Sequence, residues 1–202
     1  YTMKKLSHAF YLRHDVVQIA RELLGKVLVT QWGDAVTSGR IVETEAYAGT
    51  IDKASHAYRG LTPRTAVMFA EGGTVYIYLC YGIHQMFNIV TNIEGIPHAI
   101  LIRALEPVEG IETMLQRTGK IQLDSTLTRG PGNVGKALGF HTSQTGWSLQ
   151  SKEVFIADDG FKIAEKSITA SPRIGVAYAA EDALLPYRFF IKGNPYVSGK
   201  PK

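Results

Sequence analysis

The stretch of sequence that decides the fold reads VETEAY and spans residues 42–47. Its β-branched and aromatic residues predict a β-strand, although two of its six positions carry carboxylates. Side chains of a strand alternate between its two faces, so Glu43, Glu45 and Tyr47 are expected to share one face. Two glutamates and a tyrosine on one face indicate either a solvated surface or a site of chemistry.

The residues before VETEAY predict a short helix followed by a β-hairpin. Residues 15–24 carry apolar side chains at helical spacing, with Asp15 as the N-cap and Gly25 directly after the end. The hairpin consists of a strand, a turn and a second strand, at residues 26–32, 33–34 and 37–47. VETEAY is therefore the outgoing arm of this hairpin.

The rest of the chain predicts more strands with a few short helices between them. Residues 48–73 are rich in small and polar residues, which predicts a long, partly helical connection of the kind that carries function. A helix is expected to start at Pro107, and a glycine-rich loop followed by a short helix is expected at residues 128–140. Further strands are predicted at residues 74–81, 83–91, 99–105, 153–158, 168–178 and 188–193. This order predicts one mixed domain around an antiparallel sheet.

Length and composition indicate a folded globular protein. The chain has 202 residues, with 45% hydrophobic and 20% charged side chains, which suits one domain with a sizeable core. It contains no apolar run of about 18 residues as a membrane helix requires, and its basic start lacks the apolar core of a signal peptide. The single cysteine, Cys80, argues against an internal disulfide framework, so an intracellular protein is the simplest interpretation. A net charge of +4 is compatible with a polyanion partner without establishing one.

Glu43 and Glu45 are the first candidates for catalysis. Positions i and i+2 of a strand lie roughly 7 Å apart at Cα. Inverting glycosidases hold their two carboxylates about 6.5–9.5 Å apart, so hydrolysis of a glycosidic bond is one interpretation. The other is that both glutamates face water, as charged side chains usually do. The spacing alone leaves both interpretations open.

Three tyrosines in the predicted strand at residues 74–81 form a second candidate. Tyr76 and Tyr78 share one face of the strand, whereas Tyr81 stands beside Gly82, where the strand is expected to turn. An ordinary sheet with core tyrosines explains Tyr76 and Tyr78 better than it explains Tyr81. A tyrosine at a turn can serve as a wedge between bases or as a stacking surface.

A histidine and a glycine-rich segment complete the candidates. His56 lies in the long connection, and the six histidines show no metal-binding spacing, so no metal site is predicted. The segment RGPGNVGK, residues 129–136, has the composition of a phosphate-binding loop. It departs from the nucleotide-binding pattern GxxxxGK[ST] because Ala137 follows Lys136, so contact with a DNA phosphate is the remaining interpretation.

Taken together, these motifs resemble those of the alkyladenine DNA glycosylases, also called 3-methyladenine or methylpurine DNA glycosylases. The stretches that carry the resemblance occur in the family's order: RIVETEAY (40–47), KASHAYRGLTPR (53–64), GTVYIYLCYGIHQMFNIV (73–90), LIRALEP (101–107) and GPGNVGKAL (130–138). The resemblance runs from Leu23 to the ending RFFIKGNPYVS and indicates a compact, bacterial-type member. It implies a single α+β domain over residues 1–202, with a curved antiparallel β-sheet, flanking helices and a β-hairpin that protrudes into the DNA minor groove.

The resemblance also implies roles for individual residues. Glu45 would be the general base that activates water, Arg103 would help to hold that water, and Tyr81 would be pushed into the duplex. Glu43 is expected to give structural support. The remaining implied positions are the base pocket, with Tyr47, His56 and Tyr78 around the base and Asn88 at its floor, and the candidate DNA-backbone contacts Arg64, Arg129 and Lys136.

The function implied is that of a monofunctional DNA glycosylase. Such an enzyme flips out an alkylated or deaminated purine, of the 3-methyladenine, 7-methylguanine, hypoxanthine or ethenoadenine class, and hydrolyses its N-glycosidic bond, which starts base excision repair. The expected partner is damaged double-stranded DNA, with no cofactor and no membrane, and a monomer in the cytoplasm at the nucleoid is expected. Two alternatives stay open: an O-glycoside hydrolase that pairs Glu43 with Glu45, and a non-catalytic nucleic-acid-binding module.

Overall fold

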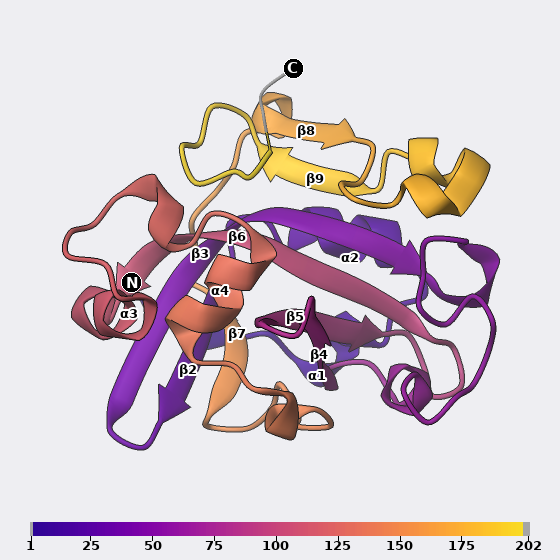
Figure 1. The fold of residues 1–202 in the computed structure, drawn as a ribbon, viewed down its shortest axis with the longest axis horizontal. Coiled ribbons are helices and arrows are strands. Elements are labelled where there is room, and N and C mark those ends of the chain that lie inside the picture. Colours follow the sequence, from indigo (N-terminus) through magenta and orange to yellow (C-terminus); the bar gives the residue numbers. More distant parts are fainter. Residues whose placement is uncertain (1, 200–202) are drawn as a thin grey trace.

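The strands of this chain form one antiparallel sheet (Figure 1). The computed structural model describes residues 2–199. In this part of the chain the sheet has nine strands in the order β1-β7-β2-β3-β6-β5-β4, and β9 pairs with both β3 and β8. The strands are Lys4–Lys5 (β1), Val27–Trp32 (β2), Ala35–Ala48 (β3), Val75–Cys80 (β4), His84–Thr91 (β5), His98–Glu109 (β6), Val154–Asp158 (β7), Ile168–Ser171 (β8) and Arg188–Ile191 (β9). The predicted α+β class with an antiparallel sheet is confirmed; the domain limits at residues 1 and 202 lie outside the described residues.

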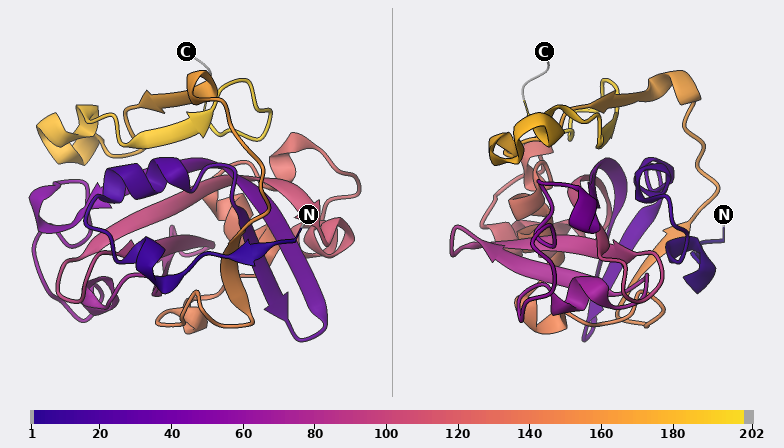
Figure 2. Two further views of the ribbon diagram at one scale, coloured as in Figure 1. Left: turned by 180° about the vertical axis from the view of Figure 1, so that it is seen from behind. Right: turned by 90° about the vertical axis from the view of Figure 1, so that its right-hand side faces the viewer.

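Short helices cover the sheet and fill its connections (Figures 1 and 2). The α-helices are His8–Tyr11 (α1), Val16–Glu22 (α2), Ile111–Thr118 (α3) and Pro131–Leu138 (α4). The 3-10 turns are Gly49–Ile51 (η1), Ala66–Phe69 (η2), Ser125–Leu127 (η3), Thr142–Gln144 (η4), Glu165–Ser167 (η5) and Ala177–Leu184 (η6). Asp15 caps α2 as predicted, since its carboxylate accepts from the backbone N of Gln18 at 3.0 Å. Within residues 2–199, no helix is both long and apolar enough to cross a membrane.

Strand β3, which contains VETEAY, is the longest strand and changes neighbours along its length. Its first half pairs with β2, its residues 43–45 pair with β9 along the same edge, and β6 follows its other edge. Between the two glutamates, Thr44 points to the opposite face, where its hydroxyl donates to the Ala20 carbonyl of α2 at 2.8 Å. The strand is thus covered on both faces, and Glu43 and Glu45 are both 0% exposed. The alternative in which the glutamates face water is wrong.

The predicted hairpin at Tyr81 is confirmed. Strands β4 and β5 are joined through Tyr81, Gly82 and Ile83, and the φ angles of Tyr81 and Gly82 are 51° and 71°. Two consecutive positive φ values are typical of the tight type I′ turn, which matches the twist of the two strands. Figure 2 (right) shows this hairpin projecting from the side of the molecule, and the Tyr81 side chain is 91% exposed.

Two predicted boundaries were wrong, at Pro107 and in the segment 168–178. Pro107 continues β6 at a register shift opposite Gly39 and does not start a helix; α3 begins after Gly110. The short helix expected within residues 128–140 is confirmed as α4, which begins at Pro131. There Gly135 serves close packing, because a Cβ atom at this position would lie 1.9 Å from the Gln85 carbonyl oxygen of β5. The strand expected at residues 168–178 ends at Ser171.

Residues 160–199, here named the C-terminal arm, run back over the rest of the fold after β7. Figure 2 shows an extended segment that leads from β7 to β8, and the β8–β9 ribbon lies above β3 and α2. Because β9 pairs with β3 at residues 43–45, the arm brings its side chains directly to the two glutamates.

Candidate active site

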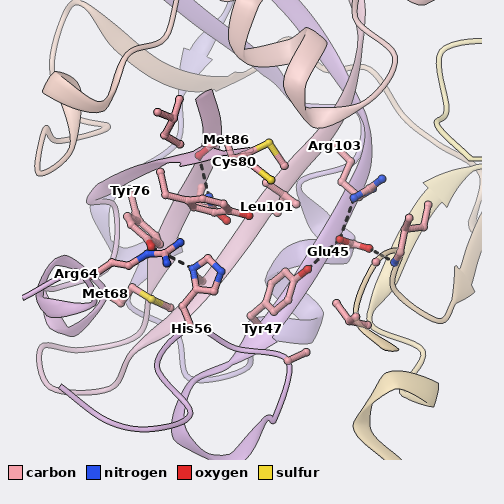
Figure 3. A pocket seen from close by; sticks show the side chains of 18 of the residues that line it. Glu45, Tyr47, His56, Arg64, Met68, Tyr76, Cys80, Met86, Leu101 and Arg103 are labelled. Atoms are coloured by element: carbon pink, nitrogen blue, oxygen red, sulfur yellow. Dashed lines mark hydrogen bonds and ion pairs between the residues drawn. The ribbon is translucent and has the colours of Figure 1, made fainter. Parts of the chain in front are cut away.

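Glu45 is a buried carboxylate held in one orientation by three donors (Figure 3). Its Oε1 accepts from the Tyr47 hydroxyl at 3.0 Å and from Nη1 of Arg103 at 3.2 Å. Its Oε2 accepts from the backbone N of Ile174 at 2.7 Å. Glu45 also lines a cavity of about 410 Å³. A carboxylate so held keeps lone pairs that can face a molecule in the cavity.

Glu43 lies on the same face of β3 but does not line that cavity. Its Oε1 accepts from Arg103 Nε at 2.9 Å, Arg188 Nε at 2.8 Å and Ser198 Oγ at 2.9 Å. Its Oε2 accepts from the backbone N of Ser198 at 2.6 Å. Glu43 is therefore occupied by the protein itself, which supports the structural role expected for it.

Arg103 bridges the two glutamates from the neighbouring strand β6. Burial alone would lower the pKa of its guanidinium, but the charges of Glu45 and Glu43 outweigh burial and raise it. Burial, followed by the charge of Glu45, likewise raises the pKa of the Tyr47 hydroxyl well above its usual value. Both groups therefore keep their protons at neutral pH and act as donors to Glu45.

Three aromatic side chains form one wall of the cavity. The rings of His56 and Tyr78 lie 4.6 Å apart in an edge-on arrangement, and those of Tyr76 and Tyr78 lie 5.6 Å apart. His56 Nδ1 is 3.1 Å from the Tyr76 hydroxyl. Partial burial of the ring, with the charge of Arg64 added, lowers the pKa of His56 below its usual 6.5, so the ring is neutral at pH 7. Tyr76 thus belongs to the cavity as well as to the core.

The floor and mouth of the cavity also contain predicted site residues. Asn88 is buried, lines the cavity and donates from Nδ2 to the Met86 carbonyl at 3.0 Å. The exposed Tyr81 stands at the mouth and also borders a second hollow of about 300 Å³ beside the N-terminus of α4. The structure therefore brings together Glu45, Arg103, Tyr47, His56, Tyr78, Asn88 and Tyr81, as the sequence indicated.

The three candidate DNA-backbone residues lie in different places. Arg64 lines the cavity (Figure 3). Its guanidinium carbon lies 5.7 Å from the centre of the Tyr78 ring. Arg129 borders the second hollow with Tyr81. Lys136 is exposed on α4 and lines neither hollow. Arg64 therefore belongs to the lining of the cavity, unlike Arg129 and Lys136.

Sequence analysis missed a buried ion pair between Asp52 and Arg173. Arg173 donates from Nη1 to Asp52 Oδ2 at 2.5 Å and from Nη2 to Oδ1 at 2.8 Å, and both side chains are almost wholly buried. Burial alone would raise the pKa of Asp52, but hydrogen bonds from Arg173 and from backbone amides outweigh it and lower that pKa. The two residues are separated by more than half of the chain, so no local pattern connects them.

Comparison with known proteins identifies the relatives of this chain. The family model described as methylpurine-DNA glycosylase (MPG) matches residues 9–195. A protein of Chlamydia felis named "Putative 3-methyladenine DNA glycosylase" is 45% identical over 188 residues, which cover 92% of this chain and 95% of that protein. A protein of the same name from Desulfitobacterium hafniense is 43% identical over 206 residues, which cover 98% of this chain and 100% of that protein.

The geometry predicts that Glu43 matters more for stability than Glu45 does. Replacing Glu43 with Gln removes a charge that two guanidinium groups contact, so we expect the free energy of unfolding to fall by about 3–5 kcal/mol. The matched change Glu45→Gln removes a charge that contacts only one guanidinium and is expected to cost less. Urea-induced unfolding followed by circular dichroism measures both; a larger loss for Glu45→Gln would contradict the structural role of Glu43.

Proposed function

We propose a mechanism for this chain, which belongs to the methylpurine-DNA glycosylase family. The chain is a 3-methyladenine DNA glycosylase that starts base excision repair of alkylated purines. We further infer that it is monofunctional and that it accepts deaminated purines such as hypoxanthine. The observation that carries this mechanism is Glu45, the one carboxylate within residues 2–199 that lines the cavity with the aromatic rings.

In the proposed reaction, Glu45 acts on water and on the sugar. The N-glycosidic bond breaks through an oxocarbenium-like transition state, whose positive charge a buried carboxylate stabilises. The same carboxylate takes a proton from the water that attacks C1′. Donors from Tyr47, Arg103 and Ile174 keep Glu45 oriented for both tasks. An alkylated purine is already electron-poor, so it leaves with little acid assistance.

The cavity suits a base that has left the stack. Its volume of about 410 Å³ falls in the range of small-molecule pockets, about 300–1,000 Å³. The enzyme cannot reach C1′ within the duplex, so the nucleotide has to rotate out into this cavity. The rings of Tyr47, Tyr78 and neutral His56 favour an electron-deficient purine through stacking and cation–π attraction.

Binding to the duplex would use the hairpin and the basic residues near it. Tyr81 would fill the gap that the flipped nucleotide leaves. Arg129 beside the hairpin and Lys136 on α4 would contact phosphates, while Arg64 would act at the rim of the base pocket. Their charge supplies affinity that does not depend on sequence.

We also propose that the chain acts as a monomer on chromosomal DNA in the cytoplasm, because residues 2–199 of one copy already form the cavity.

Two features favour this mechanism over the alternatives. An O-glycoside hydrolase of the paired-carboxylate type needs two available carboxylates, but Glu43 is occupied by Arg103, Arg188 and Ser198. A non-catalytic binding module would not require an oriented carboxylate at the cavity. Within residues 2–199, no lysine lines the cavity, which supports a reaction that leaves an abasic site without strand cleavage.

The first test measures free base released from oligonucleotides that each carry one damaged purine. We expect release of alkylated purines by the wild type without strand cleavage, and a loss of about 10²–10⁴-fold for Glu45→Gln, which cannot accept the proton of water. DNA binding by the variant should remain. Absence of release from every lesion would contradict the function, whereas release by Glu45→Gln at the wild-type rate would contradict only the role of Glu45.

Replacing Tyr81 with Ala should impair flipping more than chemistry. We expect excision of a well-paired lesion to fall about tenfold, because an inserted side chain offsets part of the few kcal/mol that unstacking costs. A mismatched lesion opens more easily, so its excision should fall less. A fluorescent base beside the lesion reports flipping directly; equal defects in the two contexts would argue against a wedge.

Asn88 is expected to control the rejection of undamaged guanine. Guanine carries a 2-amino group that adenine and hypoxanthine lack, and a floor fixed by the hydrogen bond from Asn88 to the Met86 carbonyl would collide with it. Replacing Asn88 with Ser should therefore raise the single-turnover excision rate of guanine relative to that of hypoxanthine. An unchanged ratio of the two rates would leave Asn88 with a structural role only.

A further inference from the structure

We propose that Arg173, held by Asp52, is a positioning residue that fixes both oxygens of Glu45 through Tyr47 and Ile174, an inference that rests on the proposed glycosylase reaction. Arg173 lies in the C-terminal arm and does not line the cavity. It acts on the reaction only through the two groups that it places against Glu45.

The Arg173 side chain is itself rigidly held. Besides its two hydrogen bonds to Asp52, it donates to the Ala46 carbonyl of β3 at 2.8 Å and to the Asp182 carbonyl of the arm at 3.1 Å. Asp52 in turn accepts from the backbone N of Ala48 and of Ala54, each at 3.0 Å. Bidentate pairing in a buried setting gives geometric specificity as well as binding energy. Arg173 therefore ties the arm, the end of β3 and the loop after it into one unit.

Two of the three donors to Glu45 depend on this unit. The guanidinium carbon of Arg173 lies 4.8 Å from the ring centre of Tyr47, whose hydroxyl donates to Oε1. The next residue in the chain, Ile174, donates its backbone N–H to Oε2. Arg103 supplies the remaining donor from β6. Displacement of Arg173 would therefore release one donor on each oxygen of Glu45.

Asp52 has an electrostatic role in the same arrangement. Burial alone would lower the pKa of Arg173, but hydrogen bonds and charge from Asp52 outweigh burial and raise it, and the charge of Glu45 adds to this effect. The guanidinium is thus attracted by Glu45 as well as by Asp52. By holding Arg173 in a bidentate pair, Asp52 keeps it beside the Tyr47 ring and leaves the Glu45 lone pairs free for water.

The test compares Arg173→Gln with a control that makes the same kinds of contact. Arg40 on β3 pairs with Asp159 through Nη1 at 3.1 Å and Nη2 at 2.8 Å, donates to the Gly25 carbonyl at 2.8 Å and lies 4.1 Å from the Phe161 ring centre. Arg40 contributes nothing to the cavity. Both variants are compared under conditions in which circular dichroism shows them to be fully folded.

We expect Arg173→Gln to reduce the single-turnover excision rate by about 10²-fold, the cost of misplacing a catalytic group by about 1 Å. Its affinity for DNA that carries an uncleavable lesion analogue should be unchanged. Arg40→Gln should keep the wild-type rate. Arg173→Lys should be slowed less than Arg173→Gln, because lysine keeps the positive charge although it lacks the planar guanidinium group. If Arg173→Gln does not fold, Arg173→Lys and Asp52→Asn take its place, and each should slow excision without loss of affinity.

A double-mutant cycle with Tyr47→Phe separates positioning from general stability. If Arg173 acts through the Tyr47 hydroxyl, its substitution should slow the Tyr47→Phe enzyme less than it slows the wild type. Additive effects, excision by Arg173→Gln at the wild-type rate, or an equal loss in Arg40→Gln would each overturn the proposal. Failure of the wild type to release any damaged base in the same assay would instead contradict the glycosylase function.

Discussion

The rest of this structure depends on two carboxylates, Glu43 and Glu45, that are buried from bulk solvent on one face of one strand. A buried ionised group has to be paired or its desolvation cost exceeds what the fold can supply. Arg103 on β6 contacts both Glu43 and Glu45, and Arg188 on β9 completes the balance of two negative and two positive charges. Because these cations come from opposite edges of β3, the strand has to be flanked by β6 and β9 at this point.

The C-terminal arm is the part of the fold that this constraint explains best. It runs back over β3 and brings three groups to the glutamates, namely Arg188, Ser198 and the backbone of Ile174. The same arm provides Val176 and Tyr178 to the cavity wall. One segment therefore pairs the buried charge of Glu43 and also lines the cavity beside Glu45. A change that loosens the arm at Glu43 is expected to alter the orientation of Glu45 as well.

Two chemically identical side chains thus obtain different tasks from their surroundings. Glu43 is saturated by donors from the protein, whereas Glu45 has three donors and a cavity beside it. A carboxylate that the protein saturates contributes rigidity, and one that it orients but leaves open can act on a substrate. The i, i+2 spacing along the strand was compatible with a glycosidase dyad, but of the two glutamates only Glu45 lines the cavity.

Local signals in the sequence determined much of the architecture. The strand at VETEAY, the cap at Asp15 and the turn at Tyr81 and Gly82 follow from side-chain periodicity, capping chemistry and backbone conformation, which act over a few residues. The motifs and their order also indicated the family and the residues that meet in the cavity. A local signal misled at Pro107, where the pairing of β6 with β3 continues the strand that the proline was expected to end.

Only the tertiary structure decided which glutamate is open and what holds it. Both glutamates lie on one face of β3, so the alternation of side chains along the strand cannot distinguish them. Their different partners are residues 103, 174, 188 and 198, which are distant in the sequence. The ion pair between Asp52 and Arg173 could not be predicted from the sequence either, because hydrogen bonds between distant segments leave no local sequence pattern. The sequence by itself singled out the strand that carries both glutamates, and the three-dimensional packing of the C-terminal arm gave its two carboxylates different surroundings.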